Sequence, residues 1–176
     1  MNIDESGRAE WVRAAVDRFS GPLTRYAQVI TGDLEQARDV VQDTFIRLCD
    51  EKPERVAPHL AQWLFMVCRN RAVDVQRKQG RMKPLDEREM NAQASPEPSP
   101  AAQAERRETD GEVAGLLARL PRNQQEVVRL KFQNGLSYRE ISEVTRLSVS
   151  NVGFLMHTAL KTLRQQMKPE PTRRMP

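Results

Sequence analysis

The sequence has few aromatic residues, few cysteines and histidines, and no long apolar run. Aromatic side chains make up 5% of its 176 residues and charged side chains 30%, so we expect a small hydrophobic core, in one domain or in two small ones. No apolar stretch approaches the roughly 20 residues that a membrane-spanning helix needs. We therefore expect a cytoplasmic protein with no membrane anchor.

Residues of the kinds that carry catalysis do not converge in the sequence. The two histidines, His59 and His157, lie in different segments, and the two cysteines, Cys49 and Cys68, lack metal-ligand spacing. Both cysteines fall within apolar helical patterns, where buried structural thiols are expected. There is no glycine-rich phosphate-binding loop and no nucleophile motif. We expect no enzymatic activity, no cofactor, no metal site and no small-molecule substrate.

Charge is distributed unevenly along the chain, although the net charge is only +4. Residues 8–83 carry 14 basic and 10 acidic side chains, residues 84–110 carry 3 and 7, and residues 111–168 carry 9 and 4. The middle segment is rich in proline and poor in apolar residues, which predicts a flexible linker. Two basic modules that flank an acidic linker suggest two surfaces facing a polyanion, although ordinary solvated surface gives similar counts. Residues 169–176 are expected to be a disordered tail.

Apolar periodicity predicts three helical segments before the linker. The first, over 8–31, is expected to be a helix pair or one helix interrupted at 20–22, where serine, glycine and proline are consecutive. The second follows a capping residue, Asp33. A proline-containing loop, 50–60, is expected to lead into the third, over 63–75. The predicted inward-facing residues are Leu34, Ala37, Val41, Phe45 and Leu48 in the second segment, and Trp63, Leu64, Val67, Cys68, Ala72 and Val75 in the third.

The outward face of the second segment combines acidic and apolar side chains. Asp39, Gln42 and Asp43 lie within about one helical turn of each other, with Ile46 beside them. The face could be ordinary solvated surface. A cluster of carboxylates with an apolar neighbour also suits the docking of a basic partner helix.

The end of the third segment is strongly basic. Six cations occur within 15 residues and are opposed by one carboxylate, Asp74. They are Arg69, Arg71, Arg77, Lys78, Arg81 and Lys83. The helix dipole favours some positive charge at this end, but contact with nucleic-acid phosphates explains six cations better.

Residues 137–163 have the pattern of two helices joined by a tight turn, preceded by a further helix over 121–135. Ser137 and Glu140 have the spacing of a capping box, and the second helix is expected to begin at a serine cap within 148–150. Its buried face is predicted to be Val152, Leu155, Met156, Ala159, Leu160 and Leu163, and its outward face Asn151, Phe154, His157, Thr158 and Lys161. This pattern is typical of a helix-turn-helix that enters the DNA major groove, although other amphipathic helix pairs share it.

Four segments, in this order and at these separations, make the chain resemble a bacterial RNA polymerase sigma factor of the extracytoplasmic-function (ECF) family. The segments are DLEQARDVVQDTFIRL (33–48), WLFMVCRNRAVDVQRKQGR (63–81), LPRNQQEVVRLKFQNGLSYREIS (120–142) and VSNVGFLMHTALKTLR (149–164). The resemblance implies an all-α fold with two small helical domains. It implies sigma region 2 over 8–83, a flexible linker over 84–110, sigma region 4 over 111–168 and a tail over 169–176.

The resemblance also implies partners and residue roles. Core RNA polymerase and promoter DNA are the implied partners, and an anti-sigma factor is a further candidate. The implied polymerase-binding residues are Asp39, Gln42, Asp43 and Ile46. Those implied to bind the −10 element are Arg69, Asn70, Arg71, Arg77 and Lys78. Those implied to bind the −35 element are Arg139 and Arg146, followed by Asn151, Gly153, Phe154, His157 and Lys161.

The implied recognition helix departs from the family pattern. Many relatives carry several arginines along it, whereas this chain has GFLMH over 153–157. Asparagine can pair with adenine edges and phenylalanine can contact thymine methyls, and DNA shape could also contribute, so the −35 sequence stays open. Two other functions also stay open: a helix-turn-helix regulator that binds operators alone, and a protein-interaction adaptor.

Overall fold

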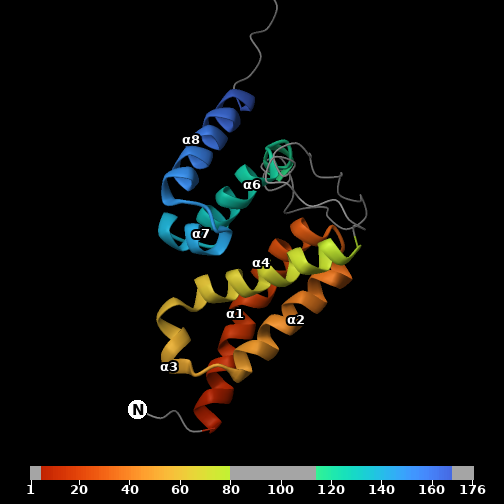
Figure 1. The fold of residues 1–176 in the computed structure, drawn as a ribbon, viewed down its shortest axis with the longest axis vertical. Coiled ribbons are helices and arrows are strands. Elements are labelled where there is room, and N and C mark those ends of the chain that lie inside the picture. Colours follow the sequence, from red (N-terminus) through yellow and green to blue (C-terminus); the bar gives the residue numbers. More distant parts are fainter. Residues whose placement is uncertain (1–4, 80–113, 168–176) are drawn as a thin grey trace, which may run out of the picture. The chain divides into compact units, whose positions relative to one another are not determined.

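The computed structural model describes residues 5–79 and 114–167, and every element in these two ranges is helical (Figure 1). The N-terminal part contains α1 (Glu5–Thr31), α2 (Leu34–Asp50), the short α3 (Pro53–Val56), a 3₁₀ turn (Ala57–His59) and α4 (Leu60–Gln79). The all-α fold class predicted from the sequence is therefore confirmed. The predicted linker, 84–110, and the tail, 169–176, lie outside the described residues, as do Arg81 and Lys83.

Helix α1 runs through the predicted interruption at 20–22, with Pro22 inside it. Proline lacks the N–H that a helix interior uses. Here its neighbours compensate, because Leu23 and Ala27 are completely buried and α1 packs against both α2 and α4. Thr24 also donates its hydroxyl to the Ser20 carbonyl at 2.8 Å. The predicted break was wrong because tertiary burial outweighs one lost hydrogen bond.

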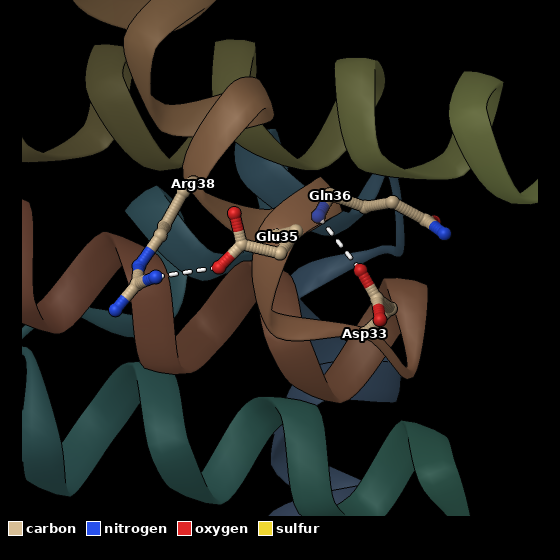
Figure 2. Close-up of polar contacts among 4 residues, drawn as sticks. All are labelled: Asp33, Glu35, Gln36 and Arg38. Atoms are coloured by element: carbon tan, nitrogen blue, oxygen red, sulfur yellow. Dashed lines mark hydrogen bonds and ion pairs between the residues drawn. The ribbon is translucent and has the colours of Figure 1, made fainter.

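Helix α2 begins where the sequence predicted. The Asp33 carboxylate accepts from the Gln36 backbone N–H at 2.9 Å, and Glu35 of the first turn forms an exposed ion pair with Arg38 at 2.5 Å (Figure 2). At its other end, the Arg8 guanidinium donates to the carbonyls of Cys49 and Glu51, the second at 3.1 Å. Capping at both ends satisfies backbone groups that a helix leaves open.

One stripe of α2 is buried against its neighbours. Its buried residues are Ala37, Val40, Val41, Thr44, Phe45 and Leu48. Leu34, which was predicted to face inward, is 39% exposed because it is the first residue of the helix. The other four predicted residues are buried, and the prediction missed Val40 and Thr44.

Helix α4 contributes Leu64, Phe65, Val67, Cys68 and Ala72 to the core of the N-terminal part. Trp63 and Val75 are only half-buried. Phe65 was missing from the predicted face, yet it is completely buried, with its ring centroid 5.2 Å from that of Tyr26 at an interplanar angle of 77°. Such edge-to-face pairs add about 1 kcal/mol to the gain from burial.

Two further predictions for this part were wrong. Residues 50–60 are not a loop: Pro53 stands at the first position of α3, where its missing N–H costs nothing, and Val56 is buried. Cys49 is exposed, although both cysteines were predicted to be buried. Cys68 is buried as predicted, and this burial raises the pKa of its thiol to about 12.

The C-terminal part contains a helical turn at 114–118, α6 (Arg122–Val128), a π-helical continuation (Arg129–Gln133), α7 (Tyr138–Thr145) and α8 (Val149–Gln166). The buried Gln125 amide donates to the carbonyls of Leu120 at 2.8 Å and Ala118 at 3.2 Å. These bonds give the two backbone carbonyls before α6 a hydrogen-bond donor. The predicted stop at Gly135 is confirmed. Gly135 has φ +71° and donates to Lys131, while Leu136 donates to Leu130, which is the bonding of a glycine C-cap.

No helix in the described ranges is long and apolar enough to cross a bilayer.

Candidate functional site

The outward face of α2 has the composition predicted for a docking surface. Asp39, Gln42 and Ile46 are exposed, and Ile46 keeps 55% of its surface in solvent although it is apolar. Asp43, on the same face, is half-buried. The opposite stripe of the helix is buried, so the helix cannot rotate to hide Ile46. We name Asp39, Gln42, Asp43 and Ile46 the α2 face.

The basic end of α4 presents its cations unequally. Arg77 and Lys78 are exposed, whereas Arg69, Asn70 and Arg71 are half-buried. Positive charge at a helix C-terminus is favoured by the dipole. These five residues are named the α4 face.

An ion pair joins the two faces. Arg71 donates through Nε to Oδ2 of Asp43 at 2.7 Å, and the two side chains keep 34% and 41% of their surface in solvent. The sequence assigned these residues to different surfaces and gave no sign that they meet. The α2 face and the α4 face therefore share a border, and a change at one of these two side chains alters the charge felt by the other.

A capping box fixes the start of α7. The Glu140 backbone N–H donates to Ser137 Oγ at 3.3 Å, and the Ser137 N–H donates to Glu140 Oε2 at 2.7 Å. The Ser137 hydroxyl also donates to that carboxylate at 2.7 Å. These bonds, the side-chain one first, lower the pKa of Glu140, so its carboxylate stays ionised and the box stays closed.

The turn between α7 and α8 is closed by local contacts. Ser142 donates its hydroxyl to the Leu147 carbonyl at 2.6 Å. Arg146 ends α7 in the left-handed conformation, with φ 61° and ψ 24°, and is the one non-glycine residue with positive φ among those described. Glycine is the usual residue in this conformation because a side chain costs energy there. An exposed arginine thus stands three residues before α8.

Helix α8 begins at Val149, directly after Ser148, and exposes the predicted face. Asn151, Phe154, His157 and Lys161 are exposed, whereas Gly153 and Thr158 are half-buried. Val152, Leu155, Met156 and Ala159 are buried on the other side, while Leu160 and Leu163 are half-buried. Arg139, on α7, is also exposed. The predicted base-reading side chains of Asn151, Phe154 and His157 are thus accessible.

Exposed apolar residues near the helix-turn-helix were missed. Phe132 is 64% exposed and Tyr138 39%, and the Lys131 ammonium lies 5.7 Å from the Tyr138 ring centroid. Phe132 points away from the core because Leu130, two residues before it, is completely buried, and residues two apart do not face the same side of a helix.

Comparisons with known proteins match both parts of the chain. The family model described as Sigma-70 region 2 matches residues 15–82, and the one described as Sigma-70, region 4 matches residues 110–163. The chain is 30% identical over 166 residues to the ECF RNA polymerase sigma factor SigL of Mycobacterium tuberculosis, covering 90% of each. It is 27% identical over 164 residues to the ECF RNA polymerase sigma factor RpoE of Cereibacter sphaeroides, covering 93% of this chain and 88% of that relative.

Two solved structures share the fold. One is CnrH in complex with the cytosolic domain of CnrY, with a TM-score of 0.59, 24% identity and coverage of 94% of this chain and 93% of that one. The other is the sigma factor RpoE in complex with the anti-sigma factor NepR from Bartonella quintana, with a TM-score of 0.57, 18% identity and coverage of 90% and 98%.

Sigma-70 regions 2 and 4, in this order, define a transcription initiation factor. The chain belongs to the family of ECF RNA polymerase sigma factors. It directs promoter recognition by RNA polymerase, and its partners are RNA polymerase and promoter DNA. It is a specificity subunit and not an enzyme. The roles of individual residues stay predictions.

Proposed function

We propose that this sigma factor binds core polymerase through the α2 face, the −10 element through the α4 face, and the −35 element through the helix-turn-helix. One observation carries the proposal: each of these surfaces includes exposed polar side chains, namely Asp39 and Gln42 on α2, Arg77 and Lys78 on α4, and Asn151, His157 and Lys161 on α8. Residues 8–83 and 111–168 are then the two binding domains, with 84–110 as the linker and 169–176 as the tail.

The α2 face suits a basic protein partner. Asp39 and Gln42 supply exposed polar groups, and Ile46 supplies an apolar contact whose burial would stabilise a complex. Charge complementarity of this kind directs partner choice and speeds association more than it adds affinity. Ile46 therefore provides much of the affinity, while the carboxylates provide specificity.

The α4 face suits a phosphate backbone. Arg77 and Lys78 are exposed at the helix end, and each phosphate that such cations neutralise makes binding more sensitive to salt. Arg71 contributes less free charge in the unbound chain because it is paired with Asp43. Asn70 and Arg69 complete the face.

The helix-turn-helix suits a major groove of duplex DNA. Arg139, Arg146 and Lys161 are exposed cations for phosphates, and Asn151, Gly153, Phe154 and His157 are the candidates for base edges. Phosphate contacts fix the register of a recognition helix, and base contacts specify the sequence.

The polymerase-binding assignment is tested by pull-down of core enzyme with the full-length chain. Asp39→Lys and Ile46→Ala should each lower core retention about tenfold or more, since interface residues of this kind contribute roughly 1–3 kcal/mol. Asp17→Lys, which reverses an exposed carboxylate on α1, is the matched control and should bind as the wild type does. If both α2 variants retained core enzyme as well as the wild type does, the assignment of polymerase binding to the α2 face would be wrong.

One further partner and a cellular location follow as part of this proposal. The solved structures of CnrH with CnrY and of RpoE with NepR support an anti-sigma factor as a partner of this chain. Because the protein acts on promoter DNA, we also propose that it works in the cytoplasm. The matches to Sigma-70 regions 2 and 4 favour a sigma factor over the other two functions left open by the sequence, a stand-alone operator-binding regulator and a protein adaptor.

A further inference from the structure

The outward side of α8 has cations only at its two ends. Arg146 stands in the turn before the helix, Lys161 lies near its C-terminal end, and both are exposed. Between them, residues 147–160 contain no lysine, arginine, aspartate or glutamate. The central residues therefore meet a binding partner through neutral side chains and His157.

Those central residues form one row along the helix. Asn151, Phe154 and His157 recur every third residue, which places neighbours about 4.5 Å apart along the axis. Phe154 keeps 66% of its surface exposed, the joint highest value among the exposed large apolar side chains of the described residues. Val152, Leu155 and Met156 are buried between them, so this rotation of the helix is fixed and the phenyl ring cannot turn into the core.

The chemistry of this row selects among base pairs. Guanine is read most often by arginine or lysine, which donate to its O6 and N7 atoms, and the centre of α8 has neither residue. A phenyl ring makes no such hydrogen bond. Its complement in the major groove is the 5-methyl group of thymine. Asn151 has the donor and acceptor that an adenine edge requires.

We propose that Phe154 determines the specificity of this sigma factor at the −35 element by contacting a thymine methyl group, with Arg146 and Lys161 on flanking phosphates. The proposal rests on the assignment of the helix-turn-helix to the −35 element and adds the class of base pair that it reads. The −35 sequence contains an A·T pair at the position facing Phe154.

The test uses holoenzyme made from the full-length chain and core polymerase of the source bacterium. Duplexes randomised across the −35 position are selected for binding, and each selected thymine is then replaced singly by deoxyuridine, which deletes only the methyl group. At one position the replacement should weaken wild-type binding about fourfold, the value of one buried methyl-sized group. Phe154→Ala should bind thymine and deoxyuridine duplexes equally, and Phe154→Leu should retain part of the difference.

Phe132→Ala is the matched control, because Phe132 is equally exposed, at 64%, but lies outside α8. It should keep the full deoxyuridine effect. Two outcomes would overturn the thymine readout alone. In one, holoenzyme protects the −35 position but binds every deoxyuridine duplex as tightly as the thymine duplex. In the other, Phe154→Ala still binds the deoxyuridine duplex more weakly. Failure to protect the −35 position, with Arg146→Ala and Lys161→Ala unchanged from wild type, overturns the −35 assignment itself.

Discussion

The two parts of the molecule build their candidate surfaces in different ways. In the N-terminal part, the surface is drawn from two helices, and its defining contact joins Asp43 on α2 to Arg71 on α4, 28 residues apart. In the C-terminal part, the start of α7 and the turn before α8 are fixed by bonds between residues three to five apart, such as Ser137 with Glu140 and Ser142 with Leu147. One surface therefore depends on tertiary packing, and the other has its geometry set by local contacts.

The largest expected effect tests the dependence of the N-terminal surface on packing. Phe65→Ala removes a completely buried ring that contacts Tyr26, and should lower the free energy of unfolding of this part by about 3–5 kcal/mol. Urea unfolding followed by hydrogen exchange in residues 5–79 measures it. Phe132→Ala, at an exposed ring, should change stability by less than about 0.5 kcal/mol. Equal effects of the two variants would contradict the burial of Phe65 in the core.

A smaller effect is expected for the local contacts of the C-terminal part. Ser137→Ala removes the cap of α7 and should cost about 1 kcal/mol. Because Ser137 lowers the pKa of Glu140 in the folded protein, the stabilisation is present above the unfolded carboxyl pKa and fades as the pH falls through the lowered folded value. The difference between wild type and Ser137→Ala should therefore shrink in acid.

Amide exchange of α7 across a pH series checks this expectation. Glu143→Gln is the matched control, an exposed carboxylate on the same helix that is not the capping-box acid. A penalty for Ser137→Ala that stays constant down to strongly acidic pH would show that the carboxylate plays no part in the cap.

Arg146→Gly separates stability from binding at the turn. Glycine adopts the left-handed conformation of residue 146 without a side-chain penalty. The free energy of unfolding of the variant should therefore be about 0.5–1 kcal/mol higher than that of wild type. The same change removes an exposed cation, so −35 binding should weaken and its salt dependence should become shallower. Thermal unfolding and salt titrations of promoter binding are the two measurements. Reduced stability would contradict the strain assigned to Arg146.

The smallest effect concerns the ion pair that crosses the N-terminal part. Both Asp43 and Arg71 are more than a third exposed, so solvent screening limits their coupling to about 0.5 kcal/mol. A double-mutant cycle with Asp43→Asn and Arg71→Gln measures that coupling by urea unfolding. The matched cycle with Asp39→Asn and Arg71→Gln should be additive, since Asp39 lies one turn away on the same face. Coupling in the second cycle as large as in the first would contradict a specific pairing of Asp43 with Arg71.

The contrast also explains how much the sequence could predict. The caps at Asp33 and Ser137 and the stop at Gly135 follow from contacts between near neighbours, and the sequence predicted each of them. The two faces of α8 were predicted in part, because Thr158, Leu160 and Leu163 are half-buried. The Asp43–Arg71 pair depends on how α2 meets α4, which periodicity does not encode.

The wrong predictions have the same physical origin. Pro22 sits inside a helix because burial of the residues after it outweighs the missing bond. Cys49 belongs to an apolar pattern in sequence but is exposed in the last turn of α2, although its neighbour Leu48 is completely buried. Neither outcome is visible without the neighbouring helices.

The two cysteines offer a chemical handle that needs no engineering. Thiol reagents attack the thiolate, and the Cys68 thiol, with a pKa of about 12 and no exposed surface, stays protonated while the fold is intact. A maleimide fluorophore added to the native protein should therefore label Cys49 alone, at the end of α2. Modification of Cys68 then reports opening of the N-terminal part. One reagent therefore labels this sigma factor and measures the rate of its unfolding.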